Sequence, residues 1–237
     1  MKIMLDCSPT KIHEYIARYQ HDFWQLRTPL TRYALSGQPY GLDNGCFTTF
    51  HERRWMKLLD DAKKAAPKFV CLPDIVGDAR RTLELFSKFQ DITVGLPRAL
   101  VLQDGIGQLP IPWNDLDAVF VGGSDAFKVS PEAIAACKTA KILKKWVHVG
   151  RVNTAGRAAN WMDLADSLDG SGISRYDHML EDVLRVIENI ELARQADLFL
   201  RPEDNPPPIS LSTWYRANRQ ATEQSTGKAL PEKDTIR

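Results

Sequence analysis

The amino-acid sequence predicts a single parallel α/β barrel of the TIM type. Its 237 residues are close to the roughly 250 that such barrels occupy as one domain. Short apolar runs alternate with amphipathic segments, and most of the apolar runs end in small or acidic residues. Apolar strands that alternate with helices are typical of a parallel sheet that helices cover on both faces. A doubly wound open sheet is the alternative.

Seven short apolar runs are predicted to be strands. They lie at residues 3–8, 40–45, 69–74, 99–105, 118–123, 146–150 and 166–172. Closing the barrel takes an eighth strand, and the weakly patterned 20–38 region is the candidate for it. If that region holds no strand, the barrel is incomplete.

Apolar residues at helical spacing predict the crossover helices. These helices are expected at residues 55–66, 79–89, 131–143 and 158–167. Residues 178–195 read as one long helix, which we expect to pack across the barrel.

Proline and charge predict that the core ends near residue 200, giving a barrel domain over 1–200 and a polar extension over 201–237. A small helix is expected at 211–220 in this extension. Its aromatic and basic side chains either stack on nucleic acid or dock on the core. They are Trp214, Tyr215, Arg216 and Arg219.

The composition excludes several classes of protein. Lys and Arg number 31 against 30 Asp and Glu, so net charge gives no general attraction to polyanions. The four cysteines show no CxxC spacing and no clustered histidines, which predicts neither a metal site nor disulfides. We expect no metal, no cofactor and a reducing cytoplasm. No run approaches the roughly 20 apolar residues of a membrane span, and the N-terminus does not read as a signal peptide.

Acidic residues recur where the predicted strands end, and the active sites of α/β barrels form at that end. These residues are Asp43, Asp74, Asp104 and Asp169. Each alone is explained as a helix cap or a turn residue. Four at one end of a barrel indicate a catalytic mouth. Nearby glycines, including Gly122, Gly123 and Gly150, would let backbone approach a flat ligand.

Six short motifs follow one another between residues 40 and 176. They are Leu42-Asp43-Asn44-Gly45-Cys46-Phe47, Pro73-Asp74, Val101-Leu102-Gln103-Asp104-Gly105, Val121-Gly122-Gly123, Trp146-Val147-His148-Val149-Gly150, and Leu168-Asp169-Gly170 followed by Arg175. In this order they resemble the motifs of the tRNA-guanine transglycosylases, and more closely those of the relatives that insert 7-deazaguanines into DNA, the DpdA group. The first motif resembles the Ser-Asp-Ser-Gly-Gly-aromatic motif of the family.

The resemblance implies a role for each matched residue. Asp169 corresponds to the nucleophile and Asp43 to the general acid/base. Phe47 would stack on the base, and Asp74 with Gln103 would read its edge by hydrogen bonds. The remaining pocket residues would be Gly122, Gly123, His148 and Gly150.

The chain departs from the family in three respects. No cysteine follows Cys137, so the zinc site of the tRNA enzymes is absent, and the chain is much shorter than theirs. Both departures favour DNA as the partner, with a 7-deazaguanine base as the second substrate. In the acid/base motif, Asn44 and Cys46 replace Ser and Gly, so the hydrogen bonds around Asp43 need not match those of the family.

Exchange of a base on an unchanged sugar with retained configuration takes two inversions, and therefore a covalent glycosyl-aspartate. Arginines after strand ends are candidates for phosphate contacts. They are Arg53, Arg54, Arg151, Arg157 and Arg175. The alternatives are a related enzyme that acts on RNA, a nucleic-acid-binding barrel without activity, and a phosphosugar enzyme. The last would use Gly122-Gly123-Ser124 as a phosphate cradle.

Overall fold

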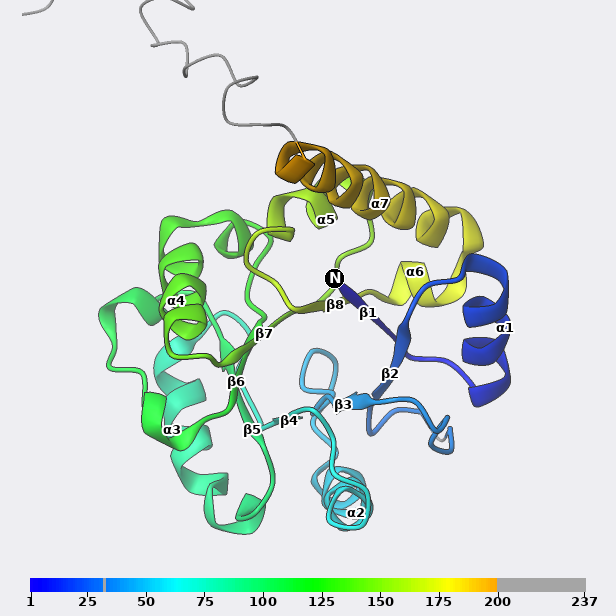
Figure 1. Ribbon diagram of the computed structural model, residues 1–237. Helices are drawn as coiled ribbons and strands as arrows, with labels where there is room; N and C mark the ends of the chain where they lie inside the picture. The colour runs from blue at the N-terminus through cyan, green and yellow to red at the C-terminus, as the bar shows by residue number, and fades with distance from the viewer. Residues whose placement is uncertain (32, 200–237) are drawn as a thin grey trace, which may run out of the picture. The chain divides into compact units, whose positions relative to one another are not determined.

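The computed structural model describes residues 1–31 and 33–199, with side chains described as far as residue 196. Eight parallel strands form a closed barrel in chain order, and β8 pairs with β1 (Figure 1). The predicted TIM-type barrel is therefore confirmed. The strands are β1 (Lys2–Leu5), β2 (Phe23–Arg27), β3 (Tyr40–Leu42), β4 (Val70–Cys71), β5 (Arg98–Leu102), β6 (Ala118–Val121), β7 (Trp146–Val149) and β8 (Ser167–Asp169).

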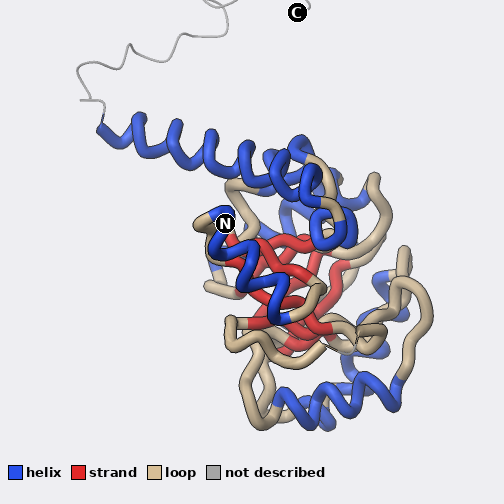
Figure 2. Tube along the Cα trace, turned by 90° about the vertical axis from the view of Figure 1, so that its right-hand side faces the viewer, coloured by secondary structure: helices blue, strands red, loops and turns tan. Residues whose placement is uncertain are grey.

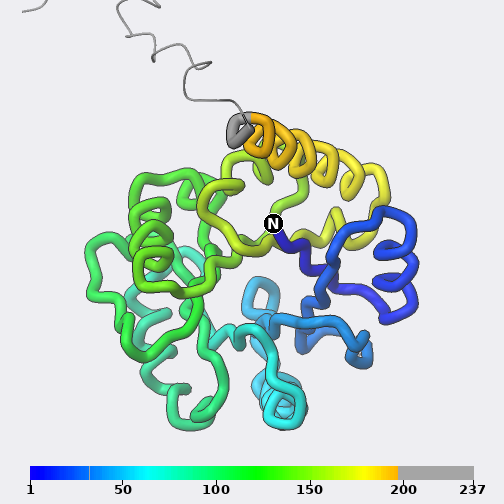
Figure 3. The backbone as a smooth tube through the Cα atoms, in the orientation of Figure 1, coloured from blue at the N-terminus to red at the C-terminus, as the bar shows by residue number. Residues whose placement is uncertain are grey.

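Helices surround the strands, which lie at the centre of the fold (Figure 2). The helices are α1 (Pro9–Tyr19), α2 (Glu52–Ala62), α3 (Ala79–Phe89), α4 (Pro131–Ile142), α5 (Ala155–Trp161), α6 (Ser171–Arg175) and α7 (Asp177–Phe199). Short 3-10 turns occupy Asp91–Thr93, Ile106–Gln108, Trp113–Asp115 and Phe127–Val129. Figure 3 shows the chain passing once around the barrel from the first strand to the last.

The eighth strand is β2, within the 20–38 region where it was sought. Its apolar pattern is interrupted by Gln25, whose side chain is fully buried. The Gln25 amide donates to the carbonyl of Ala34 at 2.9 Å and accepts from the backbone N–H of Ser36 at 3.1 Å. These bonds satisfy a polar group in the core, and they explain why the strand is hard to recognise from hydropathy.

Local capping sets the helix boundaries. Asp78, Ser130 and Thr154 each accept a hydrogen bond from the N–H three residues ahead, at the start of α3, α4 and α5. The predicted helix at 158–167 is therefore misplaced, because Thr154 starts α5 earlier and the chain enters β8 at Ser167. The sequence reading missed α1, although Ser8 caps it and Pro9 stands at its first position.

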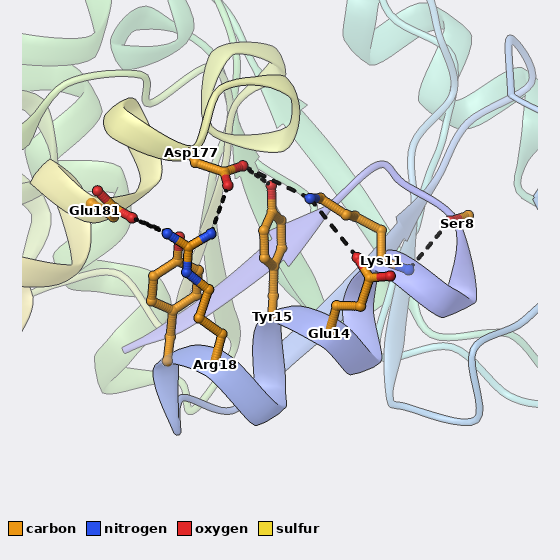
Figure 4. A network of polar contacts seen from close by, with 8 residues as sticks. Ser8, Lys11, Glu14, Tyr15, Arg18, Asp177 and Glu181 are labelled. Atoms are coloured by element: carbon orange, nitrogen blue, oxygen red, sulfur yellow. Dashed lines mark hydrogen bonds and ion pairs between the residues drawn. The ribbon is translucent and has the colours of Figure 1, made fainter.

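The first turn of α7 lies beside α1 on the outside of the barrel (Figure 1, Figure 4), whereas the long helix was expected to pack across the barrel. The Tyr15 hydroxyl donates to Asp177 at 2.6 Å, and Arg18 contacts both Asp177 and Glu181 at 2.9 Å. Apolar residues of α7 are buried in the core that separates helices from strands; they are Leu180, Val183, Leu184 and Ile187. These contacts hold the last helix against the first.

A second core fills the inside of the barrel. It contains Met4, Leu26, Phe69, Cys71, Ala99, Val101 and Ala118, with Trp24, Phe120 and Trp146 packed against it. Trp24 and Trp146 stack at 5.5 Å near the N-terminal ends of β2 and β7. The barrel is thus a packed core, and open space is confined to its ends.

One compact unit covers Met1–Ile190, and a second begins at Glu191. The predicted extension over 201–237, with its helix at 211–220 and the residues Trp214, Tyr215, Arg216 and Arg219, lies outside the described residues. In the part of the chain that is described, no helix has the length and apolar character needed to cross a membrane.

Candidate functional site

A small pocket opens at the C-terminal ends of the strands, with a cavity volume of about 70 Å³. This volume is smaller than the roughly 300–1,000 Å³ of typical small-ligand pockets. Strands β3 to β8 and the loops that follow them supply the walls. The lining residues are Asp43, Asn44, Phe47, Asp74, Val76, Val101, Gln103, Phe120, Gly122, Gly123, Arg151 and Asp169. Eight of the residues singled out in the sequence therefore meet in one place.

A hydrogen-bond network fixes the wall after β4 and β5. Asp74 is buried and accepts from the Asn44 amide at 2.8 Å and from the Gln103 amide at 2.5 Å. The side-chain oxygen of Gln103 accepts a hydrogen bond from the backbone N–H of Gly77 at 2.9 Å, which fixes the orientation of the Gln103 side-chain amide. Burial raises the pKa of Asp74, and the bonds from Asn44, Cys46 and Gln103 oppose this rise. The result is a rigid, preorganised edge.

Asp43 follows β3 directly, and its backbone N–H donates to the carbonyl of Arg27 at 2.8 Å. Its carboxylate accepts from the N–H of Asn44 at 2.8 Å. Burial raises the pKa of Asp43 to about 7, and the neighbouring carboxylates of Asp169 and Asp74 contribute to the rise. A carboxyl with a pKa near neutrality can both donate and accept a proton at physiological pH.

Asp169 is the last residue of β8 and faces the same pocket. Its Oδ1 lies 2.9 Å from Nε2 of His148, and its side chain is 14% exposed. His148 itself is fully buried and stands behind Asp169, so it does not line the pocket as the sequence suggested.

Gly150 also lies behind the pocket surface. A Cβ at this position would lie 2.5 Å from the ring of Phe120 and 3.4 Å from Oδ1 of Asp169. The absence of a side chain at Gly150 therefore lets Phe120 and Asp169 occupy adjacent parts of the wall.

The rim carries an aromatic ring and a cation. Phe47 is 62% exposed, and the guanidinium carbon of Arg151 lies 4.3 Å from the centre of its ring. Arg151 has a positive φ of 60°, which a non-glycine residue rarely adopts, and its guanidinium donates to the carbonyl of Gly123. This contact places a flat surface at the pocket entrance, of the kind on which bases stack.

The two glycines after β6 leave room for the neighbouring wall. A Cβ on Gly122 would lie 2.7 Å from Val101 and 2.9 Å from the Gln103 amide nitrogen. Gly123 has a φ of +68°, which favours glycine.

Asp104 joins the loops after β5 and β6. It accepts from the Ser124 N–H at 2.9 Å and from the Ser124 hydroxyl at 2.6 Å. Burial acts to raise the pKa of Asp104, but these two bonds outweigh it and the pKa falls below its ordinary value. Asp104 is not among the pocket-lining residues.

The predicted phosphate contacts are dispersed. Arg151 lines the pocket, whereas Arg157 is exposed and forms an ion pair with Asp125 at 2.5 Å. Arg53 and Arg54 are exposed in the first turn of α2, and Arg175 is exposed at the end of α6. The structure thus brings one of the five arginines to the pocket itself.

Asp6, at the end of β1, is an acidic residue that the sequence reading passed over. Burial raises its pKa to about 6, and the charge of Asp169 adds to this. Its Oδ1 is buried without a hydrogen-bond partner among the described residues. Like the four acids singled out, Asp6 ends an apolar run, so the signal was present in the sequence.

Lys128 is a second residue that the sequence reading missed. It is 5% exposed, and its ammonium group donates to the carbonyl of Gly150. Burial lowers the pKa of Lys128 to about 8, and the charge of Arg151 adds to this. Lys128 lies in a short 3-10 turn after β6, and no sequence pattern predicts a buried lysine there.

Among the described residues, no group of three or more His, Cys, Asp or Glu could hold a metal ion. No family model matches the chain, and no curated protein matches it. Among solved structures, the chain is similar to a protein from Aquifex aeolicus VF5, with 15% identity and a TM-score of 0.34, over 65% of this chain and 61% of that one. The match spans about three fifths of that protein. A likeness this slight carries no argument about fold or function.

Proposed function

We propose that this protein is a transglycosylase that exchanges guanine in DNA for a 7-deazaguanine base through a covalent glycosyl-aspartate. The observation that supports this best is the convergence of Asp43, Asp74 and Asp169 on one pocket, from the ends of three different strands. The order of the motifs that resemble the tRNA-guanine transglycosylases supports the same reaction. A barrel with acidic residues at its C-terminal mouth is typical of an enzyme.

In the proposed first step, a carboxylate oxygen of Asp169 attacks C1′ of the sugar. The new C–O bond forms as the C1′–N9 bond breaks, and the electron pair leaves with guanine, which takes a proton from Asp43. In the second step, Asp43 accepts the N9 proton of the incoming base. N9 then attacks C1′ and releases Asp169. The pKa of Asp43, about 7, suits both transfers.

In this proposal the base is recognised by Asp74 and Gln103, which follow β4 and β5. Asp74 and Gln103 already bond each other, but each keeps capacity for one more partner, since a carboxylate oxygen accepts twice and an amide nitrogen donates twice. The N–H groups of an aminopyrimidinone edge are suitable donors to Asp74. Phe47 would stack on the base. A guanine reaches the pocket only when it is flipped out or single-stranded, which costs a few kcal/mol.

DNA is proposed over RNA because the motif resemblance is closer to the relatives that act on DNA. The structure offers less support for a phosphosugar enzyme. Such an enzyme would cradle a phosphate with the Gly122-Gly123-Ser124 segment. The N–H and the hydroxyl of Ser124 already donate hydrogen bonds to the Asp104 carboxylate, so these two donors are occupied.

The test is exchange of radiolabelled guanine into nucleic acid, with guanine-containing DNA and a tRNA assayed in parallel. We expect label in DNA and none in tRNA. The Asp169→Asn variant provides the blank, and Asp60→Asn, an exposed substitution on α2, controls for the loss of a surface charge. Label in tRNA alone would replace DNA by RNA as the substrate, and label in neither would refute the transglycosylase.

A further inference from the structure

A chain of hydrogen bonds runs through the barrel interior to the proposed nucleophile. Nε1 of Trp146 donates to the Ser167 hydroxyl at 2.8 Å. That hydroxyl lies 2.7 Å from Nδ1 of His148, and Nε2 of His148 lies 2.9 Å from Oδ1 of Asp169. The four residues belong to the neighbouring strands β7 and β8. The chain therefore connects the start of β7 with the catalytic end of β8.

The hydrogen-bond capacities of these groups assign every proton. An indole nitrogen only donates, so Trp146 occupies one lone pair of the Ser167 oxygen. Ser167 is fully buried, and within the described residues Nδ1 of His148 is the acceptor in reach of its O–H. Nδ1 must then be unprotonated. The proton of a neutral imidazole lies on Nε2, where it points at the Asp169 carboxylate.

The other protonation states leave a buried group unsatisfied. A proton on Nδ1 would point at Ser167 and leave its O–H without an acceptor. If the ring were neutral in that form, a bare Nε2 would also face a carboxylate oxygen. The ring packs against both Phe69 and Phe120, whose ring centroids lie 5.0 and 4.7 Å away. In such apolar surroundings a hydrogen bond left unmade destabilises the fold, because the buried group has no water to bind instead.

We propose that His148 is the positioning residue for Asp169, held as the Nε2–H tautomer by Ser167 and Trp146. Its hydrogen bond fixes Oδ1 of Asp169 and leaves Oδ2 as the oxygen that attacks C1′. No described residue donates a hydrogen bond to Oδ2. The attack rests on the proposed function, whereas the tautomer and the bond to Oδ1 do not.

The tautomer is tested by the ring ¹⁵N spectrum of the full-length protein at pH 7. The chain has five histidines, so the spectrum of His148→Gln identifies the signals to assign. We expect a proton on Nε2 and none on Nδ1. A protonated Nδ1, with or without a proton on Nε2, would overturn the assignment whether or not the protein acts on DNA.

Positioning is tested by the rate at which a covalent adduct forms with guanine-containing DNA. His148→Phe keeps a ring but loses the donor, whereas His148→Gln keeps an N–H in reach of Asp169. We expect the phenylalanine variant to react up to about 100-fold more slowly, the glutamine variant to recover much of this rate, and both to need a similar DNA concentration for half-saturation. His13→Gln, on the exposed face of α1, is the matched control.

A purely structural role predicts the opposite order of effects. If His148 only fills space, the phenylalanine variant should react at the wild-type rate, because the ring is kept. The glutamine variant should then react no faster than the phenylalanine variant, because its N–H would not matter. That result would overturn the proposal. Should His148→Phe fail to fold, Ser167→Ala takes its place, since it releases the ring from its Nδ1 partner. An unchanged rate in that variant would also refute the proposal. If the wild-type protein forms no adduct, the transglycosylase is refuted and the spectrum still decides the tautomer.

Discussion

The two ends of the barrel use the same residue types in opposite ways. At the N-terminal end, acids lie next to partners. Asp166 accepts from Lys141 at 2.6 Å and from the N–H of Val147 at 2.8 Å, and Asp117 accepts from the N–H of Arg98 at 3.0 Å. This end also has a depression lined by Lys68, Lys141, Lys144 and Lys145 around these acids. Every acid named here therefore has a cation or an N–H donor beside it.

At the C-terminal end, acids also accept hydrogen bonds, but several of them lie close enough to one another for their charges to interact. Burial and the charges of Asp169 and Asp74 raise the pKa of Asp43 to about 7. Burial together with the charge of Asp169 raises the pKa of Asp6 to about 6. Such crowding destabilises the ionised fold, and strain of this kind gathers at functional sites. One end of the barrel thus contributes stability, and the other uses part of it to hold reactive groups.

The largest effect is expected for the nucleophile. Asp169→Asn should abolish the covalent adduct with guanine-containing DNA, because an amide does not replace a carboxylate as a nucleophile. Asp43→Asn should slow adduct formation by about 10²- to 10⁴-fold, the usual contribution of a positioned acid/base group, without abolishing it. A denaturing gel of protein mixed with DNA, in the absence of incoming base, measures both.

Asp166→Asn is the matched control from the other end of the barrel, and its adduct should form at the wild-type rate. An adduct that survives Asp169→Asn but disappears in Asp43→Asn would exchange the two proposed roles. If Asp166→Asn were as damaging as Asp169→Asn, the contrast between the two ends would be wrong.

The positions of the site residues follow largely from the order of strands in the sequence. Runs that end in Asp43, Asp74 and Asp169 are recognisable, and a parallel barrel brings their ends together. The partners of these acids are not recognisable, because hydrogen bonds between distant strands leave no local pattern. Asn44 was interpreted as a departure from a motif, yet its side-chain amide donates hydrogen bonds to Asp74 and to the Leu72 carbonyl. His148 read as pocket lining, yet it supports Asp169 from behind.

The same limit applies to the fold. Helix α3 was predicted at its observed bounds from its amphipathic spacing, and the structure shows that Asp78 caps its start. Strand β2 was only a candidate, since the buried Gln25 interrupts its apolar pattern and its amide is satisfied by a loop. Local signals were enough to predict α3, although α1 was missed despite its local Ser8 cap, and residues whose environment is built from distant segments could not be predicted.

A smaller effect is expected where the pocket wall is narrowed. Gly122→Ala places a Cβ 2.7 Å from Val101 and 2.9 Å from the Gln103 amide nitrogen, so Gln103 must shift from Asp74. We expect the KM for the incoming base to rise about tenfold or more, since about 1.4 kcal/mol of lost binding is a factor of ten, with a smaller change in kcat. Exchange kinetics at varied base concentration measure this.

Gly156→Ala is the control for Gly122→Ala. Gly156 is exposed in α5, and a Cβ there meets nothing within 4 Å. Its kinetics should stay unchanged, and thermal unfolding should show an equal or higher Tm, because alanine favours a helix over glycine by up to about 1 kcal/mol. An unchanged KM in Gly122→Ala would show that the wall after β6 does not position Gln103 for the base.

The last effect concerns stability and its dependence on pH, and not the reaction itself. The pKa of Asp43 is about 7 in the folded protein and about 3.9 in an unfolded chain, so the folded state binds the proton more tightly. The contribution of Asp43 to stability is therefore fully present below about pH 4, and it is lost as the pH rises through 7. Asp43→Asn removes this titration. Relative to the wild type, the variant should become more stable as the pH rises, by about 4 kcal/mol at pH 8, and show little difference at pH 4. Asp166→Asn should instead lose about 1 kcal/mol of stability at pH 7, because it weakens an ion pair and a hydrogen bond.

Urea unfolding at pH 4, 6 and 8 measures the stability of all three proteins, with the Asp6 carboxyl present in each. If Asp43→Asn were the less stable protein at pH 8, the carboxyl would be stabilised at the mouth, and crowding would not distinguish the two ends of the barrel.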